Sequence, residues 1–231
     1  MIGFYDYTVI LTYLSLVSAS CGIMVALSGG GHPYIGAFFL LFCGLCDAFD
    51  GKVARTKKNR SQAERSFGVQ IDSLSDLVAF GVLPAAIGSA VLRRSALMRP
   101  VYETPWEKPL GGALTAILIL YILAAMIRLA YFNVTEEERQ KTEDGVRKYY
   151  TGLPVTSAAL IFPVILLLQY VIPADVTSLY FAAAVVCAIA FLSPFQIRKP
   201  GLGGVLILVG IGAVEFLLML ALILVRKFLH C

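Results

Sequence analysis

The sequence lacks any polar stretch long enough to fold as a separate soluble domain, and it contains no internal repeat and no low-complexity tract. Only 15% of its 231 residues are charged, whereas 58% are hydrophobic. A soluble domain of this length could not keep so much apolar surface away from water. These shortages exclude a soluble globular protein and favour a chain that lies in a membrane.

We also expect neither a secretory signal peptide nor a set of paired cysteines. Residues 1–6 contain no basic residue, and no small-residue cleavage site follows a short apolar core, so we expect no cleaved leader. The five cysteines are odd in number, and four stand within apolar runs, so we interpret them as small buried residues. Cys43 and Cys46 have CxxC spacing, but the neighbouring carboxylates favour hard ions over a soft-metal site.

What the sequence does contain is a series of apolar runs of about 20 residues, the length that crosses roughly 30 Å of hydrocarbon. We therefore expect an all-α, polytopic integral membrane bundle. The predicted spans are residues 7–27, 34–55, 61–91, 110–132, 152–172, 178–192 and 206–225.

Local signals orient these spans. The basic clusters at 56–60 and 196–200 predict cytoplasmic ends, with the N terminus inside and the C terminus outside. Capping boxes at Ser61–Glu64 and Thr135–Glu138 predict the start of the third span and of a short surface helix. In the first span we expect the hydroxyl side chains to face other helices. These hydroxyl residues are Thr12, Ser15, Ser18 and Ser20.

Four carboxylates stand where apolar segments meet the first basic cluster. We call them the motif aspartates: Asp47, Asp50, Asp72 and Asp76. At about 100° per residue, the first two share one helix sector with Gly51, Ala54 and Arg55. Gly68 and the last two aspartates follow at intervals of four residues on the next, antiparallel helix. The two stripes can therefore face each other, with small residues leaving room for a substrate.

Such a cluster favours divalent-metal chemistry. Four carboxylates repel one another unless a cation is present, and oxygen ligands suit Mg²⁺, Mn²⁺ or Ca²⁺. A two-ion site can clamp a phosphoryl group, and Arg55 can add a bidentate grip on a phosphate. An aspartate that is not fully used as a ligand can take a proton from an attacking hydroxyl.

Two alternatives compete with this interpretation. The aspartates could be solvated, or paired with Lys52, Arg55 and Lys57. They could also line the pathway of a divalent cation transporter, although transporter sites tend to lie near the membrane midplane.

The order Asp47-x-x-Asp50-Gly51-x-x-Ala54-Arg55, followed by Gly68-x-x-x-Asp72-x-x-x-Asp76, resembles the signature of the CDP-alcohol phosphotransferases (phosphatidyltransferases). Here twelve residues separate Arg55 from Gly68, where that family usually has eight. Within the family, the chain most resembles the phosphatidylserine synthases. Segments 72–85, 128–133 and 152–154 carry that resemblance.

The resemblance implies one membrane-embedded domain over residues 1–231. It has a six-helix family core at about 7–200 and an extra span at about 203–227. It implies transfer of the phosphatidyl group from CDP-diacylglycerol to the hydroxyl of L-serine, which yields phosphatidylserine and CMP. In that chemistry the motif aspartates hold two divalent cations, Mg²⁺ or Mn²⁺, and Asp76 is the general base. The residues implied to bind CDP are Asp47, Gly51, Ala54, Arg55 and Gly68.

The acceptor site is a separate hypothesis, drawn from charge and location. Arg128 could pair the serine carboxylate, with Asn133, Lys148 and Tyr149 nearby. Another acceptor, glycerol 3-phosphate or inositol phosphate, would need extra cationic grips. These could come from Lys57, Lys58, Arg60 and Arg65. The resemblance further implies a homodimer, and we expect a prokaryotic plasma membrane with the site facing the cytoplasm and no nucleic-acid partner.

Overall fold

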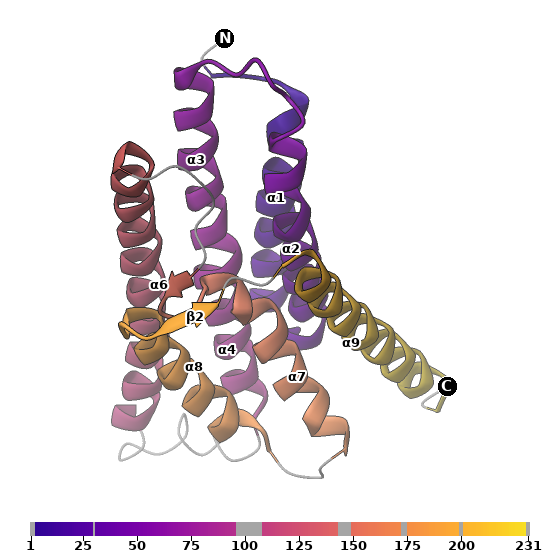
Figure 1. Ribbon diagram of the computed structural model, residues 1–231. Helices are drawn as coiled ribbons and strands as arrows, with labels where there is room; N and C mark the ends of the chain where they lie inside the picture. The colour runs from indigo at the N-terminus through magenta and orange to yellow at the C-terminus, as the bar shows by residue number, and fades with distance from the viewer. Residues whose placement is uncertain are drawn as a thin grey trace.

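The computed structural model describes residues 3–29, 31–95, 108–142, 149–171, 175–198 and 201–229, which form a helical bundle with one pair of short strands (Figure 1). The first half contains η1 (Tyr7–Val9), α1 (Ile10–Leu27), α2 (Pro33–Ala54), α3 (Gln62–Asp76), η2 (Leu77–Val82) and α4 (Leu83–Arg94). The second half contains α6 (Lys108–Thr142), β1 (Tyr149–Thr151), η3 (Val155–Ser157), α7 (Ala158–Val171), α8 (Thr177–Leu192), β2 (Gln196–Arg198) and α9 (Leu202–Leu229).

Among the residues that the structure describes, five helical segments are long and apolar enough to cross a membrane. They are Tyr7–Leu27, Pro33–Ala54, Gln62–Arg94, Pro109–Arg139 and Gly203–Leu222. The helices α7 and α8 are also apolar but shorter, at 14 and 16 residues. The prediction of a polytopic helical membrane protein is therefore confirmed, and the two predicted spans at 152–172 and 178–192 are its shortest members.

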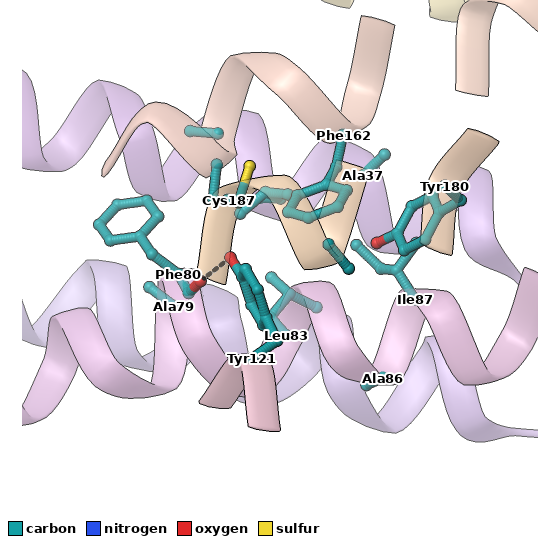
Figure 2. Close-up of a cluster of buried hydrophobic side chains, with 14 of the residues drawn as sticks. Ala37, Ala79, Phe80, Leu83, Ala86, Ile87, Tyr121, Phe162, Tyr180 and Cys187 are labelled. Carbon is teal, nitrogen blue, oxygen red and sulfur yellow. Dashed lines mark hydrogen bonds between the residues drawn. The ribbon is translucent and has the colours of Figure 1, made fainter. Parts of the chain in front are cut away.

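The third span is one continuous helix with a π-helical turn, η2, that begins directly after Asp76. Pro84 follows this turn and has no N–H, so it cannot give the α-helical hydrogen bond to the carbonyl of Phe80. The Tyr121 hydroxyl donates to that carbonyl instead, at 2.6 Å (Figure 2). Tyr180 similarly donates to the carbonyl of Pro84, at 2.7 Å. Two tyrosines on other helices thus stabilise the irregular turn beside Asp76.

The same tyrosines belong to the hydrophobic core, which is formed by residues of α1, α2, the third span, α6, α7 and α8 (Figure 2). Tyr121 and Tyr180 are at most 1% exposed, and each contacts the ring of Phe162, with centroids 5.6 and 4.7 Å apart. Aromatic pairs in these orientations pack favourably beyond their buried area. The core therefore holds the third span rigidly, directly below the segment that carries the motif aspartates.

The short surface helix predicted to start at Thr135 is wrong, because α6 continues without a break to Thr142. The Thr135 hydroxyl donates to the carbonyl of Tyr131 within the helix, at 2.9 Å, and does not cap an N terminus. The segment is rich in Glu, Arg, Gln and Lys, which are strong helix formers, and Arg139 pairs with Glu136 at 2.7 Å. By contrast, the capping box at Ser61–Glu64 is confirmed as the start of α3.

The hydroxyl residues of the first span meet the expectation in three of four cases. Thr12, Ser15 and Ser18 are buried against other helices, and Ser18 donates to the carbonyl of Phe39 in α2. Ser20 is exposed and donates to the carbonyl of Leu16 in its own helix, so the prediction for Ser20 is wrong. Back-bonding of this kind satisfies a hydroxyl without a neighbouring helix.

In Figure 1, α1, α2, α3 and the end of α6 rise above the level of the strand pair, and α9 diverges from the rest of the bundle. The two strands pair antiparallel, with Tyr150 opposite Ile197. Gly152 follows β1 with a φ of +73°, and a β-carbon there would lie 2.9 Å from the carbonyl oxygens of Phe191 and Ser193. Only glycine fits this close approach to the end of α8.

Candidate active site

The motif aspartates come together at the upper part of the bundle, from the last turns of α2 and the last turns of α3. The carboxyl groups of Asp50 and Asp72 are in hydrogen-bond contact, and Asp47 lies near enough to both to interact electrostatically. Asp76 is the most buried, at 8% exposed, and it also interacts electrostatically with the other three. The two stripes that helical spacing predicts therefore face each other.

No lysine, arginine or histidine forms an ion pair with these four carboxylates in the part of the chain that the structure describes. Among the same residues, no three His, Cys, Asp or Glu side chains are spaced as ligands of one metal ion. The donor set itself consists of four carboxylates and includes no soft ligand, which is the chemistry that Mg²⁺ and Mn²⁺ prefer. The side chains therefore fit a hard divalent cation by chemistry, although not by spacing.

The small residues on the α2 stripe border open space. A β-carbon at Gly51 would meet only Nη2 of Arg55, at 3.9 Å. Ala54 is half-buried and ends α2, and Arg55 is the exposed C-cap residue beyond it. The guanidinium of Arg55 therefore lies beside Gly51, free of any ion pair with a described carboxylate, where it can reach a ligand.

The space at Gly68 on α3 is occupied in a different way. A β-carbon there would lie 2.7 Å from Nη2 of Arg60, which belongs to the link between α2 and α3. The same Nη2 donates to the carbonyl of Glu64 at 3.1 Å. The guanidinium of Arg60 thus lies over the bare α-carbon of Gly68, one helical turn before Asp72.

The link is held at both of its ends. Lys57 Nζ lies 2.7 Å from Asp6 Oδ2 and 2.8 Å from Glu64 Oε1, and the hydroxyl groups of Tyr7 and Thr56 are 3.1 Å apart. The hydrogen bond from Lys57 holds the pKa of Asp6 well below its usual range, and the same bond raises the pKa of Lys57. The N-terminal segment is therefore fastened to the link by an ion pair.

Two serines next to the α3 aspartates anchor that helix to its neighbours, and the sequence pattern did not single them out. Asn133 Nδ2 of α6 donates to Ser73 Oγ at 2.7 Å, and Ser75 Oγ donates to the carbonyl of Thr12 at 3.1 Å. Asn133 therefore lies one residue from Asp72 across the α3–α6 contact. The signal that could have indicated these contacts is the Ser-x-Ser spacing between the two aspartates.

The remaining candidates for the acceptor site are spread over a wider area. Arg128 is 6% exposed, and its Nε donates to the carbonyl of Leu153 at 3.3 Å while its guanidinium lies 5.4 Å from the ring of Phe132. Tyr149 is exposed on β1. Lys148 lies outside the described residues. The structure therefore brings Asn133 to the aspartates, and joins Arg128 to the Gly-Leu-Pro segment that precedes α7.

Comparison with known families assigns most of the chain to one of them. The sequence profile of the CDP-alcohol phosphatidyltransferases matches residues 8–195. The matched segment includes every motif aspartate and ends before α9.

Individual relatives cover a shorter stretch. The CDP-diacylglycerol–serine O-phosphatidyltransferase of Saccharomyces cerevisiae is 36% identical over 163 residues, which are 68% of this chain and 51% of the yeast protein. The archaetidylserine synthase of Methanothermobacter thermautotrophicus is 32% identical over 64% of this chain and 53% of its own length. The CDP-diacylglycerol–serine O-phosphatidyltransferase of Helicobacter pylori is 29% identical with the same coverage. The chain thus spans about half the length of these relatives.

Proposed function

Because the chain belongs to the CDP-alcohol phosphatidyltransferase family, we propose that it transfers the phosphatidyl group of CDP-diacylglycerol to the hydroxyl of L-serine, giving phosphatidylserine and CMP. The observation that carries the proposal is the convergence of the motif aspartates from two membrane helices. The names of the relatives support serine as the acceptor, since each of the three is a serine transferase or a serine-lipid synthase.

The substrate would lie along the two acidic stripes. Its lipid tails would remain in the bilayer, and its CDP part would extend toward the cytoplasmic ends of α2 and α3. Gly51 and Ala54 leave room for it, Asp47 and Gly68 border it, and the guanidinium of Arg55 can grip a phosphate with two parallel hydrogen bonds. These contacts orient the lipid-side phosphorus toward the deepest aspartate.

Asp76 is the proposed general base. It would accept the proton of the serine hydroxyl as that oxygen attacks the lipid-side phosphorus. A bond forms between the serine oxygen and this phosphorus, and the bond from the phosphorus to the bridging oxygen of CMP breaks. CMP leaves with the electron pair of that bond. The burial of Asp76 and the Ser75 hydrogen bond to Thr12 keep the base in one position.

The motif aspartates are also the proposed ligands of two divalent cations, Mg²⁺ or Mn²⁺. Bound there, the ions would neutralise the charge of the diphosphate and of the leaving group. Two observations support this assignment: carboxylates converge from both helices, and none of the four forms an ion pair with a described lysine, arginine or histidine.

For the acceptor, we propose that Arg128 forms an ion pair with the serine carboxylate. We propose that Asn133, which contacts α3 from α6, also borders the acceptor. Lys148 and Tyr149 complete the proposed set. The hydrogen bond between Asn133 and Ser73 supports an acceptor position close to Asp72. Arg128 is buried against Leu153 and Phe132, which would fix its guanidinium in place for a small carboxylate.

The protein is membrane-embedded, and we propose that the site faces the cytoplasm and that two copies form a homodimer. The basic residues of the link support the orientation. We retain a prokaryotic plasma membrane as a proposal, while the relatives come from a yeast, an archaeon and a bacterium. We also propose one domain over residues 1–231, with the family core at about 7–200 and the extra span at about 203–227.

The deciding experiment is an acceptor screen with the purified chain in detergent and CDP-diacylglycerol as donor. We expect CMP release that depends on both L-serine and a divalent cation, and that stops with a chelator. If CMP is released with glycerol 3-phosphate or inositol phosphate but not with serine, the chain carries out the same chemistry on another acceptor. Metal flux into liposomes with no CMP release would instead support the transporter.

A further inference from the structure

The link between α2 and α3 contributes a side chain to the site that the family signature does not include. Residues 55–61 form this link, and its position is set by the Lys57 ion pairs and by the capping box at Ser61 and Glu64. The capping box is reciprocal, with Glu64 N–H donating to Ser61 Oγ and Ser61 N–H donating to Glu64 Oε2. Arg60, which stands between these anchors, is therefore held in a defined place.

The guanidinium of Arg60 lies over the stripe of α3 that carries Gly68, Asp72 and Asp76. Its Nη2 donates to the carbonyl of Glu64, and the guanidinium covers the α-carbon of Gly68. Residues 64, 68, 72 and 76 follow at intervals of four, so they share one face of the helix. The rise of 1.5 Å per residue places Gly68 about 6 Å above Asp72 and about 12 Å above Asp76.

One donor of this guanidinium is left without an acceptor. Arg60 Nε is buried and has no hydrogen-bond partner among the described residues. Buried polar groups in native proteins are nearly always paired, so this donor lacks the partner that a ligand or an ordered water would supply. No described carboxylate forms an ion pair with Arg60, which leaves its charge available to an anion.

We propose that Arg60 binds the CMP portion of CDP-diacylglycerol and thereby helps to determine the nucleotide affinity of this chain. The inference rests on the proposed function, because it takes the nucleotide substrate from there. A substrate with its reacting phosphorus at Asp76 and its tails in the bilayer extends its nucleotide toward Gly68 and Arg60. A guanidinium suits this position, since its planar set of donors matches phosphate oxygens or a carbonyl on the base.

The same geometry explains the glycine at position 68. Any side chain there would displace the guanidinium of Arg60, because even a β-carbon would lie 2.7 Å from Nη2. It also gives the stretch between Arg55 and Gly68, which is four residues longer than is usual in the family, a role in covering the nucleotide.

The test uses the full chain in detergent and compares Arg60→Ala with Arg94→Ala. Arg94 is an exposed arginine at the opposite end of the third span, so it controls for the loss of one positive charge. We expect Arg60→Ala to raise the KM for CDP-diacylglycerol and the inhibition constant of CMP by about tenfold or more, the factor for one lost hydrogen bond to a charged group. The KM for serine should not change, and Arg94→Ala should leave all three constants unchanged.

Two further variants extend the test, and the first of them keeps it informative if Arg60→Ala folds poorly. Arg60→Lys keeps the charge but not the planar donors, and it should recover only part of the CMP affinity. Gly68→Ala should weaken CMP binding by displacing Arg60, and the added methyl group should matter less in an Arg60→Ala background. Equal effects of the methyl group in both backgrounds would contradict the proposal.

Two other outcomes would overturn the inference. CMP inhibition within twofold of the wild-type value in Arg60→Ala would remove Arg60 from the nucleotide site. A rise confined to the KM of the acceptor would make Arg60 an acceptor residue. Direct equilibrium binding of CMP to the wild type and to Arg60→Ala requires no acceptor. It therefore tests the inference even if the chain uses an alcohol other than serine.

Discussion

The hydroxyl of Tyr121 in α6 donates a 2.6 Å hydrogen bond to the main-chain carbonyl of Phe80, four residues after the proposed general base Asp76 (Figure 2). Both residues are fully buried. This bond replaces one that Pro84 cannot make, and it ties the π-helical turn of the third span to α6. The position of Asp76 therefore depends on a contact outside the signature.

Removing that hydroxyl should destabilise the protein. In Tyr121→Phe the carbonyl of Phe80 loses its partner in an apolar core, which costs about 1–3 kcal/mol of unfolding free energy. We expect a lower thermal midpoint in detergent and reduced turnover. Tyr131→Phe, an exposed position on the same helix, is the matched control and should change neither. An unchanged midpoint in Tyr121→Phe would show that the bond does not stabilise the turn.

Asp76→Asn separates a base from a ligand. If Asp76 accepts the serine proton, kcat should fall by about a hundredfold to ten-thousandfold, the usual contribution of a general base, while much of the CMP affinity remains. The two quantities are measured by CMP release and by equilibrium CMP binding at saturating divalent cation. Equal losses in both would make Asp76 chiefly a metal ligand.

Arg128→Lys tests the acceptor site. Lysine keeps the positive charge but loses the fork that can hold a carboxylate with two hydrogen bonds, so the KM for serine should rise by about tenfold. The KM for CDP-diacylglycerol should stay within twofold of the wild-type value. If the serine KM is unchanged, Arg128 has no role in acceptor binding, and its contacts with Leu153 and Phe132 are structural.

The ion pair of Asp6 with Lys57, which anchors the link, should stabilise the protein only while Asp6 is ionised. The pKa of Asp6 is lowered from its ordinary value of 3.8, so its stabilising effect is complete above that value and is lost as the pH falls toward the depressed pKa. The difference in thermal midpoint between wild type and Asp6→Asn should therefore be constant near neutral pH and vanish under strongly acidic conditions. A difference that persists unchanged in strong acid would exclude the ion pair as its source.

We expect that replacing Glu215 in α9 by an apolar residue stabilises the protein. It is 4% exposed, and neither carboxyl oxygen has a hydrogen-bond partner among the described residues. It borders a groove of about 650 Å³ between α7 and α9 that is otherwise lined by apolar residues. Glu215→Met should raise the unfolding free energy by about 1 kcal/mol or more, because a buried polar group without a partner is costly.

The matched control for Glu215 is Val214→Leu, an exposed neighbour on the same helix, which should change stability by less than about 0.5 kcal/mol. Catalytic turnover should be unaffected in both variants, since α9 lies beyond the segment that matches the family. A clear loss of stability in Glu215→Met would indicate that the carboxyl group has a stabilising partner.

Sequence alone was sufficient for the membrane class, the long helices and the convergence of the motif aspartates. Each depends on a signal carried along the chain. Runs of apolar residues report a span because hydrocarbon excludes unpaired polar backbone, and carboxylates four residues apart share a helix face because of the helical period. The capping box at Ser61 and Glu64 was likewise readable, because its two hydrogen bonds are local.

Tertiary structure decided what depends on contacts between distant segments. The π-helical turn after Asp76 is stabilised by hydrogen bonds from two tyrosines. These tyrosines lie 41 and 96 residues along the chain from the carbonyl groups to which they donate. The same holds for the hydrogen bond from Asn133 to Ser73, and for the burial of Glu215, which the sequence shows only as the single acidic residue of α9. The separate surface helix predicted at Thr135 failed because a capping pattern does not stop a preceding helix when strong helix formers continue it.

The segment from Asp47 to Asp76 has some features that the sequence predicts and others that only the tertiary structure reveals. The spacing of its aspartates and small residues predicts a cavity with acidic walls. It does not reveal that the link folds back, or that Arg60 occupies the space above Gly68. The link that carries Arg60 is joined by Lys57 to Asp6, fifty-one residues earlier in the chain, and no periodic pattern in the sequence indicates such a contact.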